Sequence, residues 1–258
     1  ATRPDHPAVI MTGSGKQITY GDMEAESNRF AHLLRARGIQ QGDAFAVLLE
    51  NRIEYFTLIW GSQRAGTMLV PISSRLTAPE AAYIIRDAQA TLLITSSYFT
   101  AILGDIRAAC PGLEVLVMDE GGAENFAAAL AAQPATPIPD QRAGMVMLYS
   151  SGTTGRPKGI RPAPPEDPDP MAPVPLLGLA TMGAGMPADG TMVYLSPAPL
   201  YHAAPIGWCS IVHRLGGTVV MMEKFDPEEA LKAIERHKVT DSQWVPTHFV
   251  RFLKLDPA

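Results

Sequence analysis

The sequence predicts an α/β fold with mainly parallel sheets flanked by helices, arranged as two similar α/β subdomains. Short runs rich in Leu and β-branched residues alternate with longer segments of helical period, and this alternation requires crossovers that favour parallel strands. Apolar residues make up 47% of the 258 residues, which is enough for a substantial core. A proline-rich segment interrupts the alternation once and separates the two expected subdomains, residues 1–160 and 176–258.

The first subdomain contains a helix whose two ends are marked in the sequence. Thr19 and Asp22 have the spacing of a capping box before a helix over residues 23–37, and Gly38 follows as a helix-ending residue. Strand and helix then alternate through residue 132. The expected strands cover residues 44–49, 68–72, 92–95 and 113–118, and the expected helices cover residues 53–65, 79–88, 97–109 and 124–132.

Residues 161–175 contain seven prolines, so neither a helix nor a central strand is expected there. We expect an exposed connector, although its position directly after Gly159 also allows a lid over a neighbouring site. In the second subdomain, Asp226 is the expected N-cap of a helix with Pro227 in its first turn. The expected elements there are strands at residues 192–195, 217–222 and 239–244 and helices at residues 226–237 and 249–255.

The motif at residues 149–159, which reads YSSGTTGRPKG, is the most informative one in the chain. An apolar run at residues 145–148 precedes it, as expected for a buried strand that leads into a loop. Glycines allow the backbone to approach an anion closely. Hydroxyl and ammonium groups donate strongly to charged phosphate oxygens, at about 1.5–3 kcal/mol each. The motif therefore predicts a loop that binds a polyphosphate.

The spacing of this loop excludes the Walker A motif, G-x-x-x-x-G-K-[ST]. Counted from Gly152, the second required glycine falls on Pro157, and Lys158 is followed by Gly159 instead of a hydroxyl residue. The hydroxyl that holds magnesium in that motif is therefore missing. The alternative is that this segment is an ordinary turn rich in Ser, Gly and Thr that binds no ligand.

At these residues the sequence resembles the adenylate-forming superfamily, which includes acyl-CoA synthetases, luciferases and the adenylation domains of peptide synthetases. Residues 149–159 match the phosphate loop of that family throughout. Further similar segments lie at residues 18–22, 28–34, 38–43, 197–202 and 244–247. The resemblance thus covers nearly the whole chain and corresponds to the N-terminal portion of an acyl-CoA synthetase. It implies that the two α/β subdomains are parts of the family's large N-terminal domain.

The resemblance also implies roles for individual residues. The residues expected to hold the β- and γ-phosphates of ATP are Ser150, Ser151, Thr153, Thr154 and Lys158, with Gly152, Gly155 and Gly159 giving backbone access. Lys158 and His202 are the expected catalytic residues. His202, Ala203, Trp208 and Trp244 are the expected lining of the acyl pocket. From the sequence alone, a histidine or tryptophan in such a setting is as well explained as a core or loop residue.

The implied reaction of the complete enzyme joins a carboxylic acid to AMP and then to coenzyme A. ATP, Mg²⁺ and coenzyme A are the implied cofactors, and an apolar acid is the expected substrate. The motifs for adenine, ribose and the C-terminal lysine are expected after residue 258, so the C-terminal domain is absent and this chain alone is expected to be inactive. Alternatives are a peptide-synthetase or luciferase-like adenylating enzyme, a phosphotransferase that releases ADP, and a non-catalytic anion-binding protein.

Composition excludes several other classes of function. A net charge of −5 with no basic stripe argues against a nucleic-acid-binding protein. Cys110 and Cys209 lie far apart without metal-site spacing, as is typical of packing residues in a reducing compartment. No apolar stretch reaches the roughly 18 residues that a transmembrane helix needs, and no signal peptide is recognisable. We therefore expect a cytoplasmic protein; its oligomeric state stays open, with a homodimer among the options.

Overall fold

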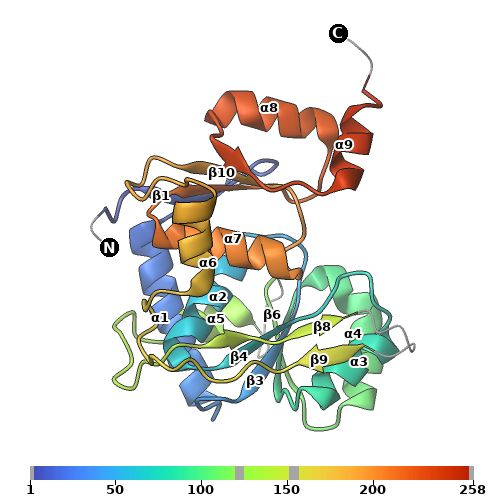
Figure 1. The fold of residues 1–258 in the computed structure, drawn as a ribbon. Helices are drawn as coiled ribbons and strands as arrows, with labels where there is room; N and C mark the ends of the chain where they lie inside the picture. The colour runs from blue at the N-terminus through green and yellow to red at the C-terminus, as the bar shows by residue number, and fades with distance from the viewer. Residues whose placement is uncertain (1–2, 120–124, 151–156, 256–258) are drawn as a thin grey trace. The chain divides into compact units, whose positions relative to one another are not determined.

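The computed structural model describes residues 3–119, 125–150 and 157–255. The chain forms two compact units (Figure 1). Unit 1 comprises Ala1–Asp22, Asn51–Ile53 and Pro173–Ala258, and unit 2 comprises Met23–Glu50 and Glu54–Ala172. These units differ from the predicted subdomains because the first 22 residues and residues 51–53 belong with the C-terminal part of the chain.

Unit 2 is built on a five-stranded sheet in the order β6-β5-β3-β4-β7. Every neighbouring pair in it is parallel, as the alternation of strands and helices predicts. Its strands are β3 (Ala44–Leu48), β4 (Met68–Pro71), β5 (Leu92–Thr95), β6 (Glu114–Val117) and β7 (Met145–Val146). The central strand β3 is buried along its whole length, which is typical of a parallel strand covered on both faces.

Helices cover both faces of this sheet. They are α1 (Tyr20–Ala36), α2 (Glu54–Ala65), α3 (Ala78–Asp87), α4 (Thr100–Ala109) and α5 (Phe126–Ala131), with a 3₁₀ turn at Ser97–Phe99. On one face, α3 and α4 pack against alternate residues of β3, among them Ala46 and Leu48. On the other, the Phe30 ring of α1 meets the Phe45 ring edge-on at 5.3 Å. The result is a helix–sheet–helix sandwich.

Local signals explain where α1 begins and ends. The Asp22 carboxylate accepts hydrogen bonds from the Thr19 backbone N–H and hydroxyl, and the Asp22 N–H donates to the Thr19 hydroxyl at 3.1 Å. This is the predicted capping box, although the helix already begins at Tyr20. Gly38 takes a positive φ of 75° just after the helix, a conformation that a residue without Cβ adopts at little cost.

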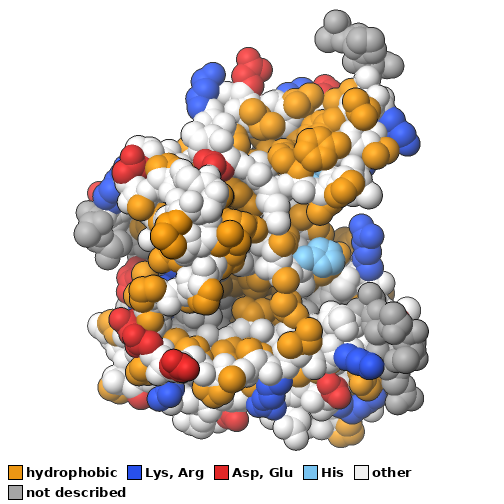
Figure 2. All heavy atoms as spheres, viewed as in Figure 1, with side chains coloured by type: hydrophobic (Ala, Val, Ile, Leu, Met, Phe, Trp, Pro, Cys, Tyr) orange, Lys and Arg blue, Asp and Glu red, His pale blue; other side chains and the backbone are white. Residues whose placement is uncertain are grey.

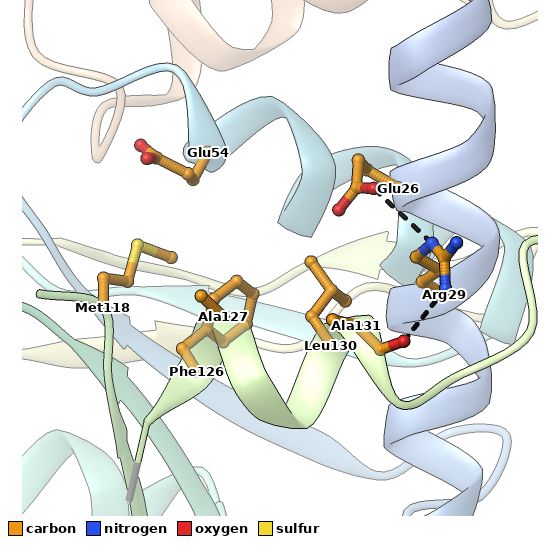
Figure 3. A pocket seen from close by; sticks show the side chains of 8 residues that line it. All are labelled: Glu26, Arg29, Glu54, Met118, Phe126, Ala127, Leu130 and Ala131. Atoms are coloured by element: carbon orange, nitrogen blue, oxygen red, sulfur yellow. Dashed lines mark hydrogen bonds and ion pairs between the residues drawn. The ribbon is translucent and has the colours of Figure 1, made fainter. Parts of the chain in front are cut away.

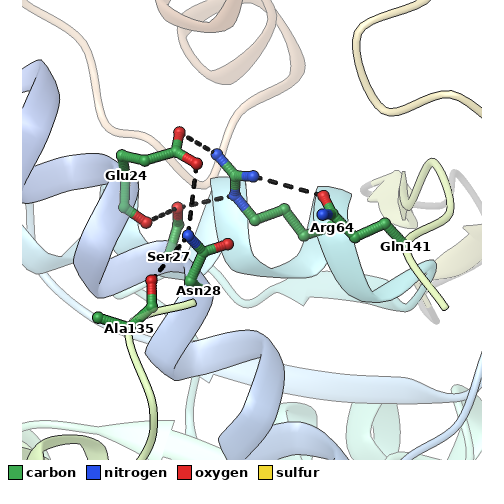
Figure 4. Close-up of polar contacts among 6 residues, drawn as sticks. All are labelled: Glu24, Ser27, Asn28, Arg64, Ala135 and Gln141. Atoms are coloured by element: carbon green, nitrogen blue, oxygen red, sulfur yellow. Dashed lines mark hydrogen bonds and ion pairs between the residues drawn. The ribbon is translucent and has the colours of Figure 1, made fainter. Parts of the chain in front are cut away.

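A polar cluster ties the segment before β7 to α1 and α2 (Figure 4). The Arg64 guanidinium forms an ion pair with Glu24 and donates to the Ser27 hydroxyl at 2.9 Å and to the Gln141 side chain at 3.4 Å. The Asn28 amide donates to the Ala135 carbonyl at 3.0 Å. These bonds hold the residues that lead into β7 and the strands after it.

Unit 1 is built on a second five-stranded sheet, in the order β12-β10-β11-β1-β2. Its strands are β1 (Pro7–Met11), β2 (Gln17–Thr19), β10 (Val193–Ser196), β11 (Thr218–Met221) and β12 (Asp241–Ser242). All pairs are parallel except β1 with β2. The pairing of β1 with β11 brings the start of the chain into this unit.

The helices of unit 1 are α6 (Pro175–Gly178), continued by a π-helical turn at Leu179–Gly183, α7 (Ala203–Arg214), α8 (Pro227–His237) and α9 (Pro246–Phe252). Figure 1 shows α7 and α8 on opposite faces of the sheet. The predicted cap of α8 is confirmed, because the Asp226 carboxylate accepts from the N–H groups of Glu228 and Glu229 at 3.0 and 3.1 Å.

The expected boundaries in unit 1 differ most from the structure at three places. The proline-rich segment ends one residue earlier than expected, because Pro175 starts α6, and proline suits the first turn of a helix, where no N–H bond is lost. The expected strand at 239–244 is only two residues long. The last helix begins at Pro246 instead of Phe249 for the same reason as α6.

Apolar side chains gather on the surface formed by α8 and α9 (Figure 2). The exposed ones in these two helices and beside them are Leu231, Val245, Phe249, Val250 and Leu253. Among the described residues, no helix is both long enough and apolar enough to cross a membrane.

Candidate functional site

The motif at residues 149–159 lies on a two-stranded antiparallel sheet in unit 2. Its strands are β8 (Leu148–Ser150) and β9 (Lys158–Ile160). The Ser150 and Lys158 backbones lie opposite each other, the Ser150 hydroxyl donates to the Lys158 carbonyl at 3.5 Å, and both residues are exposed. The paired residues thus carry a hydroxyl and an ammonium group on neighbouring strands, at the ends that face residues 151–157 in the sequence. Ser151, Gly152, Thr153, Thr154 and Gly155 lie outside the described residues.

Tyr149 and Gly159 form the next pair along this hairpin. Residues directly opposite each other in an antiparallel pair project to the same face, so the tyrosine ring lies over the glycine. A Cβ on Gly159 would lie 2.8 Å from Tyr149 Cζ and 2.6 Å from Met147 Cε. A side chain at residue 159 would therefore displace the Tyr149 ring and the end of the Met147 side chain, a packing role that the sequence did not predict alongside the expected contact of Gly159 with phosphate.

The Tyr149 side chain also bonds outside the hairpin. Its phenol O–H donates to Asp87 Oδ2 at 2.6 Å, at the last residue of α3. Burial, and then the hydrogen bond to Asp87, raise the pKa of Tyr149 above its ordinary value, so the phenol is protonated and available as a donor at neutral pH. The next cation, Arg161, donates to the Gly42 carbonyl at 3.1 Å.

His202 stands at the start of α7 in unit 1. It is the N-cap residue of this helix, its side chain is exposed, and its ring lies 4.4 Å from the Tyr201 ring. The N–H groups in the first turn of a helix favour a nearby negative charge. The imidazole and the helix start together suit a carboxylate ligand.

Asn51 holds the segment that leads to His202, and the sequence did not single it out. Its side-chain amide donates to the carbonyls of Ala198 and Met222 at 3.2 and 2.9 Å, and its Oδ1 accepts from the Leu200 N–H at 2.8 Å. Asn51 is 8% exposed. The signal in the sequence is its place just after a buried strand, where polar side chains of α/β proteins often serve a site.

The other expected pocket residues also lie in unit 1. Ala203 is exposed in the first turn of α7, and Trp208 is half-buried in the same helix. Trp244 is half-buried in an aromatic cluster, with its ring 5.2 Å from the Phe252 ring and 5.6 Å from the His248 ring. His202 precedes α7 as its N-cap and Ala203 and Trp208 lie in that helix, whereas Trp244 lies in the cluster beside α9.

A separate cavity of about 290 Å³ lies in unit 2 (Figure 3). Its lining residues are Glu26, Arg29, Glu54, Met118, Phe126, Ala127, Leu130 and Ala131. Figure 3 shows an apolar side formed by α5 and a polar side formed by α1, where Arg29 lies 3.5 Å from the Glu26 carboxylate and donates to the Ala131 carbonyl. None of the described residues of the predicted site lines it.

The chemistry of the described donor groups fits a phosphate ligand, since Ser150 and Lys158 are exposed and form the strand pair nearest the segment that joins β8 to β9. In the part of the chain that the structure describes, no group of three His, Cys, Asp or Glu side chains is placed to hold a metal ion. Both cysteines are buried thiols, and burial raises the pKa of Cys209 to about 12.

Comparisons with known proteins bear on the family and the fold. A family model described as AMP-binding enzyme matches residues 1–258. The chain is 31% identical over 265 residues to the fatty acid–acyl-carrier-protein ligase ScoC of Streptomyces coeruleorubidus, covering 98% of this chain and 47% of that protein. It is 28% identical over 263 residues to the long-chain-fatty-acid–CoA ligase FadD13 of Mycobacterium tuberculosis, covering 98% and 49%. The chain therefore spans about half the length of the curated relatives it matches.

The fold is similar to that of a solved structure, ATP-bound MatB from Rhodopseudomonas palustris. The two share 27% sequence identity with a TM-score of 0.79, over 99% of this chain and 49% of that one. This similarity confirms the predicted α/β fold with mainly parallel sheets.

Proposed function

Because the chain belongs to the AMP-binding enzyme family, as its resemblance to adenylate-forming enzymes predicts, we propose that the complete protein activates a carboxylic acid with ATP and transfers the acyl group to coenzyme A. The observation that carries this proposal is the hairpin that pairs Ser150 with Lys158 and presents both side chains to solvent. A hydroxyl and an ammonium group at that place suit the phosphates of ATP, and MatB has been solved with ATP bound.

The main requirement of the proposed reaction is that the protein stabilises negative charge. A carboxylate oxygen attacks the α-phosphorus of ATP, the bond to the β-phosphate breaks, and pyrophosphate leaves. Because both reactants are anions, the protein must hold them together and neutralise charge on the leaving group. Lys158 supplies a positive charge and Ser150 a hydrogen-bond donor toward the β- and γ-phosphates, with Ser151, Thr153 and Thr154 in the same role.

The expected residues for the carboxylate lie at and within α7. His202 at the start of α7 would orient the carboxylate, and Ala203 and Trp208 of the same helix would line an apolar acyl pocket. Trp244 is proposed as a further part of that pocket. The name of FadD13, a long-chain-fatty-acid–CoA ligase, agrees with an apolar acid as substrate.

The acceptor of the acyl group has a second candidate. ScoC, at 31% identity, is named as a ligase that uses acyl-carrier protein in place of coenzyme A. Both acceptors end in a thiol that attacks the acyl carbon and releases AMP, so the first half of the reaction is the same. We also propose that Mg²⁺ accompanies ATP and that the protein works in the cytoplasm, where its two buried thiols stay reduced.

The experiment is a product analysis with the complete protein, ATP, Mg²⁺ and acids of increasing chain length. The proposal predicts AMP and pyrophosphate in equal amounts, dependent on the acid, and a thioester only when a thiol acceptor is added. Parallel reactions with coenzyme A and with acyl-carrier protein decide between the two acceptors. Release of ADP and phosphate would instead indicate a phosphotransferase, and no turnover with any acid would indicate a binding protein.

A further inference from the structure

We propose that Tyr149 is a positioning residue of the phosphate site, which holds the hairpin and thereby the Lys158 ammonium in place. This inference rests on the proposed function and adds to it a residue that does not itself touch ATP. Three features of unit 2 support it: the packing of the ring on Gly159, the hydrogen bond to Asp87, and the small size of the hairpin.

The ring fills the space that a side chain at Gly159 would occupy. A Cβ there would lie 2.8 Å from Cζ and 2.9 Å from the hydroxyl oxygen of Tyr149. Gly159 has no positive φ, so its backbone does not require glycine. An aromatic ring that covers a glycine on the neighbouring strand stabilises the pairing of the two strands and determines their register. Tyr149 and Gly159 therefore act as one structural pair.

The phenol connects this pair to the body of the unit. Asp87 ends α3, whose buried residues belong to the core beside β3, and the Tyr149 ring packs against the same core. The bond to the Asp87 carboxylate is short, at 2.6 Å, as expected for a hydrogen bond to a charged acceptor. One side chain thus ties the hairpin to a helix 62 positions away in sequence.

The hairpin needs such a connection because it is small. Its described strands pair at three positions and form a sheet of their own, apart from the five-stranded sheet of the unit. Isolated two-stranded hairpins are marginally stable in water. Lys158 immediately precedes Gly159, so a rotation of the hairpin about its base would move the ammonium away from the phosphates. Small displacements of a positioning group are costly to catalysis.

The first test measures binding of inorganic tripolyphosphate to the 258-residue chain by calorimetry. Tyr149→Phe keeps the ring and removes only the bond to Asp87. We expect about three- to tenfold weaker binding, the range of one hydrogen bond to a charged group that is exposed. Asp87→Ala should have the same effect, and the double variant should be no weaker than either single one. Tyr20→Phe is the matched control, since its phenol donates to the Gly217 carbonyl in unit 1.

A second test separates positioning from general stability. Hydrogen exchange at the backbone amides of Ser150 and Lys158 should become faster in Tyr149→Phe and unchanged in Tyr20→Phe. In the complete protein, Tyr149→Phe should raise KM for ATP by a similar factor and leave KM for the acid unchanged. Gly159→Ala should also weaken binding, because the added methyl group would displace the Tyr149 ring and the end of the Met147 side chain.

The outcomes separate this inference from the proposed function. If Lys158→Ala loses tripolyphosphate binding while Tyr149→Phe binds and exchanges like the original chain, the role of Tyr149 is refuted and the phosphate site stands. If the original chain does not bind tripolyphosphate, the proposed phosphate site fails and the positioning role fails with it. Faster exchange in Tyr149→Phe together with weaker binding supports the inference.

Discussion

His213 should make the stability of this protein depend on pH. It is 5% exposed in α7, and its Nε2 lies 3.1 Å from the Ala8 carbonyl oxygen. A carbonyl oxygen only accepts, so Nε2 carries the proton of a neutral imidazole. The Tyr20 ring packs edge-on against it at 6.0 Å between ring centres. Protonation of His213 at low pH would therefore create a charged imidazole inside the protein.

Burial lowers the pKa of His213 from 6.5 to about 4, and the bond to Ala8 offsets only part of that change. The unfolded chain therefore binds a proton between about pH 6.5 and pH 4 that the folded chain does not bind. Stability from this residue is fully present above pH 6.5 and decreases as the pH falls toward 4. At about 1.4 kcal/mol for each pH unit, the loss at pH 5 is roughly 2 kcal/mol.

The assay is urea unfolding of the original chain and of His213→Gln at pH 7.5, 6 and 5. Glutamine can donate to Ala8 but does not titrate in this range, so the difference between the two proteins isolates His213. The original chain should lose about 2 kcal/mol more than the variant between pH 7.5 and pH 5. His237→Gln is the comparison: His237 is half-buried at the end of α8, and burial also lowers its pKa, so this variant shows the effect of a less buried histidine. The reasoning would be refuted if the free energy of unfolding fell by the same amount in the original chain and in His213→Gln between pH 7.5 and pH 5.

Two further predictions concern packing and the loop before α7. Gly61→Ala should destabilise unit 2 by about 1–3 kcal/mol, because its Cβ would lie 2.6 Å from Phe30 Cδ1. The matched change Gly104→Ala, in α4 with open space around it, should stabilise by about 0.5–1 kcal/mol. Thermal unfolding of both variants checks this, and equal effects would contradict the packing. Asn51→Ala should cost about 2–4 kcal/mol, since it leaves the buried Leu200 N–H and Met222 carbonyl without their partner. It should also raise KM for the acid more than KM for ATP in the complete protein. An unchanged KM for the acid would show that Asn51 does not influence the role of His202.

The features that the sequence predicted well depend on neighbouring residues. Asp226 and Pro227 mark the start of α8 because a cap acts on N–H groups two and three positions away. The motif at residues 149–159 can be recognised because its hydroxyl residues, glycines and lysine are contiguous, and its role in binding phosphate stays a prediction. The parallel direction of β3, β4, β5 and β6 follows from the alternation of strands with helices.

The features that the sequence did not predict depend on residues far apart. The pairing of β1 with β11 joins Val9 to Val219, and no local pattern specifies that partner. Asn51 bonds to Met222, 171 positions later. The bond between Tyr149 and Asp87 exists only because α3 ends beside the hairpin. Each is a product of tertiary packing and becomes visible only in the structure.

The rate of acyl-adenylate formation by Lys158→Ala in the complete protein tests the central claim most directly. The measurement is acid-dependent release of AMP and pyrophosphate, with Lys224→Ala as the control for loss of an exposed lysine. We predict a decrease of about 10²–10³ for Lys158→Ala, as expected when one charge-stabilising donor is removed, and no change for Lys224→Ala. An equal rate for Lys158→Ala and the original protein would contradict the assignment of the hairpin as the phosphate site.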